Sequence, residues 1–175
     1  MKVCLACGER FVSTGWLCPT CGHSPSLGAG YPLFAPDVAS GDGSDVEYRY
    51  EDLYRVEANN FWFRSRNRLL IWALRRYFPD AQSFFEIGCG TGFVAAEIAR
   101  VFPGMLLSAS DVLVKGLVFA QRRLPQAQLY QMDARRMPFE SEFDVIGAFD
   151  VLEHIVEDQV VLTQMFEVTV ASTPG

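Results

Sequence analysis

The stretch 83–93, Ser-Phe-Phe-Glu-Ile-Gly-Cys-Gly-Thr-Gly-Phe, constrains the fold of this chain more than any other part of the sequence. An apolar run there ends at three glycines spaced by two, Gly88, Gly90 and Gly92, and a helical pattern follows at once. Glu86 stands two positions before the first glycine. A strand, a tight glycine turn and the start of a helix, in this order, allow the backbone to approach a nucleotide-like ligand closely. The stretch therefore predicts an α/β fold with a ligand-binding turn.

The glycine spacing is Gly-x-Gly-x-Gly, whereas dinucleotide binders show Gly-x-Gly-x-x-Gly, so a nicotinamide-dependent enzyme is the disfavoured alternative. With the preceding acid, the stretch resembles motif I of the class I S-adenosylmethionine (SAM)-dependent methyltransferases. The resemblance implies a Rossmann-like fold, in which a mostly parallel sheet carries helices on both faces, and SAM as the cofactor. It also implies that the backbone of this turn lies against SAM, at Glu86, Gly88, Cys89, Gly90 and Gly92. The thiol of Cys89 is not expected to act as a nucleophile.

Acidic residues follow the next two expected strands. In a parallel sheet the carboxyl ends of the strands border the ligand cleft. In the family that the chain resembles, the acid after the second strand accepts both ribose hydroxyls, which implies this role for Asp111. An Asp in this place can instead cap the following helix. The acid after the third strand binds the adenine amine beside an apolar neighbour, which implies Asp133 with Met132 or Ala134.

A nearly continuous apolar run over 143–149 predicts a fourth, buried parallel strand. The sequence that follows it, Asp-Val-Leu-Glu-His-Ile at 150–155, resembles the motif after strand four of the same family. The resemblance implies that Phe149 and Asp150 border the methyl-transfer side of the cleft. Asp150 and His154 are the catalytic candidates. His154 suits a general base, with a structural role as the alternative.

The segment before the glycine turn carries three adjacent aromatic residues at 61–63. Apolar residues at helical spacing after them predict an amphipathic helix that ends before Pro79. The arrangement Glu-x-x-x-Phe-Trp-Phe-x-x-Arg resembles a subset of methyltransferases in which this segment closes over the SAM pocket. It implies that four side chains line the cofactor or substrate site: Glu57, Phe61, Trp62 and Arg66. The alternative is simple packing with solvent-facing charge.

Four of the five cysteines form two matched pairs near the amino terminus, Cys4-x-x-Cys7 and Cys18-x-x-Cys21, each followed by glycine. Two such turns that aim their thiolates at one point predict a tetrahedral zinc site. Iron in a rubredoxin-like site is the competing interpretation, and disulfides are disfavoured. A ribbon of about twenty residues buries no core of its own, so the metal must supply most of its folding energy. We expect it to be a structural cap or a docking module.

The pattern of composition predicts three parts: a zinc ribbon at 1–23, a Pro- and Gly-rich linker at 24–46 and a SAM-binding domain at 47–175. A formal charge of −6 gives no electrostatic footprint for duplex nucleic acid, so a nucleic-acid partner is disfavoured. The chain opens without a signal peptide, and no apolar run approaches the roughly 20 residues that span a bilayer. We therefore expect a soluble, cytoplasmic protein without a membrane partner.

The four strands should lie in the order 3-2-1-4, with the later strands of the family missing. We expect that this chain is a fragment, and that the open edge of its fourth strand leads to self-association. Elements that recognise the methyl acceptor often come from the later segments, so the acceptor stays unidentified and SAM binding is better supported than turnover. The first hypothesis is a SAM-dependent methyltransferase with a zinc ribbon. The alternative is a non-catalytic SAM-binding or partner-docking protein, or an inactive fragment.

Overall fold

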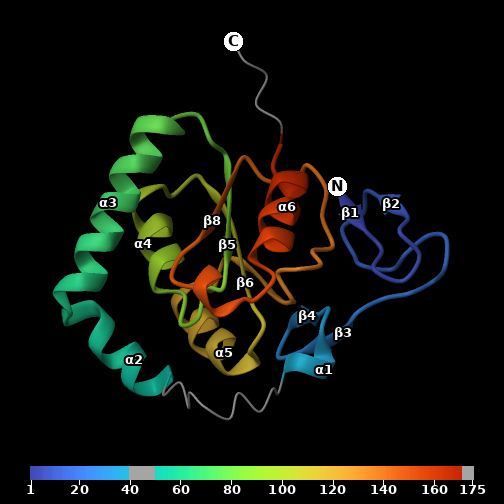
Figure 1. Cartoon of the computed structure of the whole chain (residues 1–175), viewed down its shortest axis with the longest axis horizontal. Coiled ribbons are helices and arrows are strands. Elements are labelled where there is room, and N and C mark those ends of the chain that lie inside the picture. The colour runs from blue at the N-terminus through green and yellow to red at the C-terminus, as the bar shows by residue number, and fades with distance from the viewer. Residues whose placement is uncertain (40–49, 171–175) are drawn as a thin grey trace.

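A six-stranded, mostly parallel sheet forms the centre of the computed structural model, which describes residues 1–39 and 50–170 (Figure 1). Its strand order is β3-β4-β7-β6-β5-β8. The four neighbouring strands β7, β6, β5 and β8 are all parallel and confirm the expected order 3-2-1-4. Their bounds are Ser83–Ile87 (β5), Leu106–Asp111 (β6), Gln128–Gln131 (β7) and Val145–Ala148 (β8).

Helices cover both faces of this sheet, as the Rossmann-like expectation requires. One face, which carries the buried Phe84, packs against α3 and α4 beside β5 and against α5 beside β6 and β7. The opposite face carries Phe85 and packs against α6. Adjacent residues of a strand point to opposite faces, so the Phe84-Phe85 pair supplies both cores. The helices are α2 (Tyr50–Val56), α3 (Phe61–Tyr77), α4 (Phe93–Val101), α5 (Val114–Arg123) and α6 (Asp158–Val168), with short 3-10 turns η1 (Glu57–Asn59) and η2 (Leu152–His154).

Part of the expected linker is ordered structure. Strands β3 (Ser26–Gly28) and β4 (Tyr31–Leu33) form an antiparallel hairpin, and β4 joins the sheet in parallel beside β7. The short helix α1 (Pro36–Ala39) follows. The linker prediction is thus wrong for 26–39, because glycine here permits the hairpin turn, with Gly30 at φ +94°, rather than breaking the structure. Residues 40–46 of the expected linker, and 47–49 at the start of the expected SAM-binding domain, lie outside the described part of the chain.

A fully buried amide explains why this hairpin has a fixed place. The side chain of Gln131, at the end of β7, donates to the carbonyl oxygens of Ala35 at 2.8 Å and Val112 at 2.9 Å. Its own carbonyl oxygen accepts from the Ala35 N–H at 3.0 Å. A buried amide left without partners would be costly, so these bonds fix the segment after β4 against the sheet.

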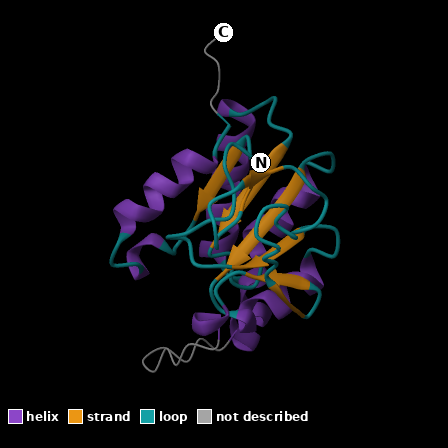
Figure 2. Cartoon of the chain, turned by 90° about the vertical axis from the view of Figure 1, so that its right-hand side faces the viewer, coloured by secondary structure: helices purple, strands orange, loops and turns teal. Residues whose placement is uncertain are grey.

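The amino-terminal residues form a small two-stranded ribbon of β1 (Lys2–Val3) and β2 (Arg10–Phe11). It lies on the α6 side of the molecule (Figure 1), and the view in Figure 2 from that side shows its loops in front of the sheet. An antiparallel bridge pairs Lys2 with Phe139, so the ribbon contacts the main body directly. None of the described helices combines the length and the apolar character needed to cross a membrane.

Candidate functional site

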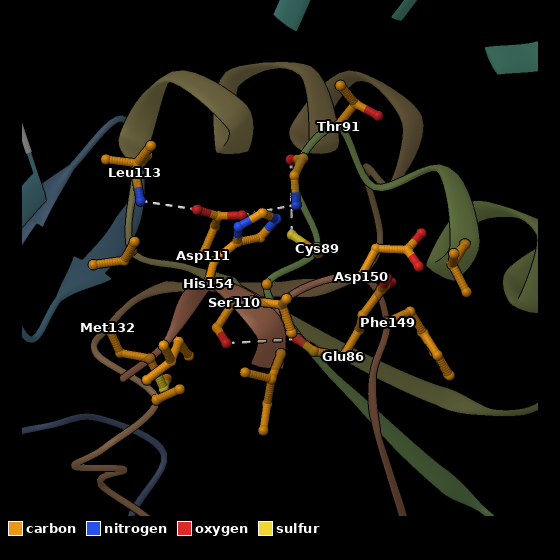
Figure 3. Close-up of a pocket in the computed structure, with 18 of the residues that line it drawn as sticks. Glu86, Cys89, Thr91, Ser110, Asp111, Leu113, Met132, Phe149, Asp150 and His154 are labelled. Atoms are coloured by element: carbon orange, nitrogen blue, oxygen red, sulfur yellow. Dashed lines mark hydrogen bonds between the residues drawn. The ribbon is translucent and has the colours of Figure 1, made fainter. Parts of the chain in front are cut away.

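A cavity of about 590 Å³ opens at the carboxyl ends of β5, β6, β7 and β8. Figure 3 shows Asp111 and Leu113 on one side of it and Phe149 and Asp150 on the other. The sequence-predicted residues that the structure brings together in its wall are Glu57, Arg66, Glu86, Gly88, Cys89, Gly90, Asp111, Met132, Asp133, Ala134, Phe149, Asp150 and His154. This is the position expected for a ligand in an open parallel sheet.

The glycine turn needs glycine for two separate reasons. Gly88, Gly90 and Gly92 all have positive φ angles, at +67°, +51° and +73°, which other residues rarely adopt. A Cβ atom on Gly88 would also lie 2.4 Å from a methyl carbon of Val151. Gly92 itself begins α4 and packs against α5, so it is not among the described residues that line the cavity.

Two residues beside this turn have ionisation equilibria shifted by burial. Loss of solvation raises the pKa of the Cys89 thiol well above its ordinary value, which disfavours the thiolate form. Burial also raises the pKa of Glu86 to about 8, although the backbone N–H of Ala95 donates to its carboxylate at 2.9 Å. Ala95 is in the first turn of α4, where an acidic group satisfies a free backbone donor. Glu86 therefore connects β5 to the helix that follows the turn.

Asp111 joins the second strand to the glycine turn. One carboxylate oxygen accepts from the N–H of Gly90 at 2.8 Å, and the other accepts from the N–H of Leu113 at 2.9 Å. Burial raises the pKa of this carboxyl. The bond to Leu113, two residues on, is a local turn, and Leu113 is itself the residue that precedes α5. A carboxylate has about four acceptor positions, so Asp111 keeps capacity for a ligand.

The third acid, Asp133, is held by a neighbouring cation. Arg135 pairs with it, with a shortest N···O distance of 2.6 Å, and also reaches Glu157 at 2.9 Å. The Arg135 hydrogen bonds lower the pKa of Asp133. Met132 and Ala134 on either side are buried and contribute apolar surface to the cavity.

The opposite wall contains an ion pair between Arg66 of α3 and Asp150 after β8. Asp150 has a φ of +53°, a left-handed conformation that Asp tolerates better than most residues. The Nε atom of Arg66 is buried and has no hydrogen-bond partner among the described residues. A buried donor without an acceptor is costly unless a ligand supplies one.

The aromatic residues before motif I divide between two environments. Phe61 is 79% exposed and Trp62 is 58% exposed, and neither is among the described residues that line the cavity. Glu57, in contrast, is buried, and its carboxylate accepts from the Thr91 hydroxyl at 2.7 Å and from Arg123 at 2.6 Å. No sequence pattern predicts the Arg123 contact, because an arginine in the last turn of a helix is ordinarily a surface charge.

The four amino-terminal cysteines come together at one point. Their sulfur atoms all lie within 4.8 Å of one another, and the closest pairs, Cys4–Cys21 and Cys7–Cys18, are 3.6 and 3.7 Å apart. These distances exclude disulfides, in which the sulfurs are about 2.05 Å apart. Tight turns with positive φ at the glycine after each pair orient the two knuckles. This donor set fits one tetrahedral metal ion.

The fold, and a cavity at the carboxyl ends of its parallel strands, are those of the class I SAM-dependent methyltransferase fold. The chain belongs to the methyltransferase domain family, whose model matches residues 84–171. A malonyl-[acyl-carrier protein] O-methyltransferase of Bacillus cereus is 25% identical over 131 residues, which cover 72% of this chain and 45% of that protein. The chain thus spans about half the length of the curated relative.

Solved structures agree with this fold. The SAM-bound CalS10, an amino pentose methyltransferase from Micromonospora echinaspora, matches with a TM-score of 0.59 and 25% identity over 72% of this chain and 52% of that one. The [4+2]-cyclase SpnF matches with a TM-score of 0.57 and 20% identity over 63% of this chain and 43% of that one. At that identity the second similarity shows the fold alone. A fold of this kind does not by itself define the reaction.

Proposed function

We propose that the protein binds SAM in the cavity at the ends of β5, β6, β7 and β8 and transfers its methyl group to an acceptor. The observation that carries the proposal is the unpartnered donor of Arg66, which is buried in the wall opposite the Asp111 carboxylate. SAM has a carboxylate at one end and ribose hydroxyls nearer the other. A cavity that offers a buried, unpaired guanidinium N–H on one side and a buried carboxylate on the other fits both groups.

The residues present also fit the remainder of the cofactor. The glycine turn has no side chains where the backbone must approach closely, and Asp111 has free acceptor capacity for ribose hydroxyls. Asp133 would accept from the adenine amine, with Met132 and Ala134 against the ring. Phe149 and Asp150 would border the reacting end of the cavity. We assign no role in SAM contact to Phe61 or Trp62, because both side chains are mostly exposed.

Bound SAM supplies a methyl group on a sulfonium, which is a good leaving group. The protein's own contribution is then mainly positioning, which can supply much of the acceleration of such a transfer. The glycine turn and Asp111 hold one part of the cofactor, and Arg66, paired with Asp150, holds another. His154 in the wall is the candidate proton acceptor for an acceptor that must lose a proton.

We also propose zinc as the metal of the four-cysteine site, with iron as the alternative. Thiolate sets of four suit both ions, and their tetrahedral geometry matches the clustered sulfurs. Metal analysis of the purified protein should find one equivalent per chain. Cys18 is the most buried of the four proposed ligands. Its replacement by Ser should abolish retention of the metal.

The methyl acceptor of this chain is unidentified. The relatives' names point to two different acceptors, malonyl-[acyl-carrier protein] and an amino pentose, and neither is assigned to this chain. The alternative function is a SAM-binding protein without turnover. A methyl-transfer assay on candidate acceptors separates the two.

Calorimetric titration tests the cofactor assignment directly. SAM and its demethylated product should bind, and NAD should not. Asp111→Ala should weaken SAM binding about tenfold or more, since hydrogen bonds to a charged group contribute about 1.5–3 kcal/mol. The matched control is Asp80→Ala, an exposed aspartate outside the cavity, which should leave the Kd unchanged. Equal SAM affinity of Asp111→Ala and the parent would refute the ribose assignment.

A further inference from the structure

The ribbon contacts the segment that leads away from the adenine side of the cavity. The backbone N–H of Val3 donates to the carbonyl oxygen of Pro138 at 2.9 Å, and the N–H of Glu140 donates to that of Met1 at 2.8 Å. In addition to these backbone hydrogen bonds, Arg10 forms an ion pair with Glu140. The segment 136–140 is thus bound along its length by the amino-terminal strand.

Arg136 connects the metal site to the cavity wall through two hydrogen bonds. Its guanidinium donates to the carbonyl oxygen of Leu5, which lies between the metal-ligand candidates Cys4 and Cys7. Its backbone N–H donates to the carbonyl oxygen of Asp133 at 3.0 Å. One residue therefore contacts both the first cysteine knuckle and the residue proposed to bind adenine.

Trp16 forms a second route on the face of the sheet. It belongs to the loop between the two cysteine pairs, and its ring packs edge-on against Phe34 at 4.6 Å, Phe139 at 5.6 Å and Tyr130 at 5.9 Å between centroids. Tyr130 lies in β7, two residues before Met132 in the cavity wall. Such aromatic contacts contribute about 0.5–1.5 kcal/mol each beyond burial.

The same loop is also held from within the ribbon. The ammonium group of Lys2 donates to the carbonyl oxygens of Ser13 at 2.6 Å and Gly15 at 2.8 Å, and it lies 4.4 Å from the centre of the Trp16 ring. The position of Trp16 therefore depends on the fold of the ribbon. That fold has little apolar support, since its own buried cluster consists of Cys4, Phe11 and Cys18.

We infer that the four-cysteine metal site is an effector of the cofactor cavity, with Arg136 and Trp16 as positioning residues that transmit its effect. Metal binding orders the ribbon, and the ordered ribbon holds the Asp133 loop and β7 in the geometry that the cofactor requires. This inference rests on the proposed SAM site and adds regulation to it. Because coupling between two binding sites is reciprocal, SAM must raise the affinity for the metal by the same factor.

The experiment compares SAM binding by the zinc-loaded chain and by the chain stripped with a chelator, by calorimetry. Removal of zinc should weaken SAM binding about fivefold or more, the usual lower range for coupled sites. Zinc titrations with and without saturating SAM should show the same factor. Equal SAM affinity with and without zinc, or a chain that takes up no zinc, overturns the inference. Absence of SAM binding in the zinc-loaded chain instead contradicts the proposed function.

If the chain unfolds when zinc is removed, the coupling can still be tested with a variant that keeps zinc but loses the contact between the ribbon and the cavity. Arg136→Met should keep one zinc per chain yet bind SAM more weakly, because the link from Leu5 to Asp133 is cut while the ligands remain. Arg68→Met is the matched control, since Arg68 is exposed on α3 and outside both the ribbon and the cavity. Parent-like SAM affinity of zinc-loaded Arg136→Met would exclude Arg136 as the transmitting residue, and the same result for Trp16→Leu would overturn the inference.

Discussion

Glu57 and Glu86 hold the two ends of the glycine turn through different interactions. Glu57 forms a buried ion pair with Arg123 and binds the hydroxyl of Thr91 inside the turn. Glu86 instead has no ion pair among the described residues, and its pKa is raised to about 8. One acid therefore contributes through its charge, and the other is most favourable to folding when it is neutral.

Stability should depend on pH through Glu86. Between its ordinary pKa of 4.5 and its folded value of about 8, the folded state binds more protons than the unfolded state. The contribution of Glu86 to the free energy of unfolding is therefore fully present below pH 4.5 and is lost as the pH rises to 8, by at most about 1.4 kcal/mol per pH unit. Urea unfolding of Glu86→Gln across this range should lack that slope. The exposed Glu153→Gln control should retain it.

The Glu57–Arg123 pair can be measured by a double-mutant cycle. Glu57→Gln or Arg123→Met alone leaves a buried charge without its partner and should lower the free energy of unfolding by about 3–5 kcal/mol. The double variant should lose much less than the sum of the two. Strict additivity in chemical unfolding would show that the two side chains do not stabilise each other.

Gly88 offers the sharpest test of the turn. Gly88→Ala places a methyl group 2.4 Å from Val151 at a φ of +67°, so we expect a loss of about 1–3 kcal/mol in stability and at least tenfold weaker SAM binding. Gly104→Ala is the control, because nothing lies within 4 Å of its added Cβ. It should change stability by no more than about 0.5 kcal/mol. A stable Gly88→Ala chain with parent-like affinity contradicts this account.

The helices and strands that have a clear local apolar pattern were predictable from the sequence. The strand expected within 143–149 is β8 at Val145–Ala148, and the helix expected to end before Pro79 is α3, which ends at Tyr77. An apolar pattern and flanking turn residues define each of them locally. The hairpin at 26–33 was not predictable, since its place depends on the amide of Gln131 nearly a hundred residues later. The Glu-x-x-x-Phe-Trp-Phe-x-x-Arg arrangement predicted that Glu57 lies at the cavity. The exposure of Phe61 and Trp62 depends on the orientation of α3, which the helical spacing of apolar residues does not specify.

Self-association through the free edge of the fourth strand, β8, stays a prediction. Among the described residues, β8 pairs with β5 on one side, and no strand pairs with its other side. Exposed strand edges favour pairing with another chain, so we expect self-association that grows with protein concentration. Multi-angle light scattering over a wide concentration range measures it. A monomer at the highest concentration would exclude this role for β8.

At the scale of the whole molecule, residues 1–39 and the centre of the chain form one structure. The amino terminus contacts Glu142, at a sequence separation of 141, and Arg136 contacts Leu5, at a separation of 131. The expectation of a ribbon separated from the body by a linker therefore misses the contacts that matter most for the proposed coupling. Sequence patterns define each part, whereas contacts between distant parts depend on three-dimensional packing.

This arrangement has a consequence for synthesis on the ribosome. The cysteine pairs emerge first and are close enough in sequence to bind a metal alone, but their docking surface emerges more than a hundred residues later. Contacts of such long sequence separation form slowly. We expect the metal-dependent ribbon to fold early and to dock only after β7 has formed. The change in Trp16 fluorescence on docking can be followed during refolding. With zinc present, one fast phase independent of the sheet should precede docking. A single phase with and without zinc would contradict this order.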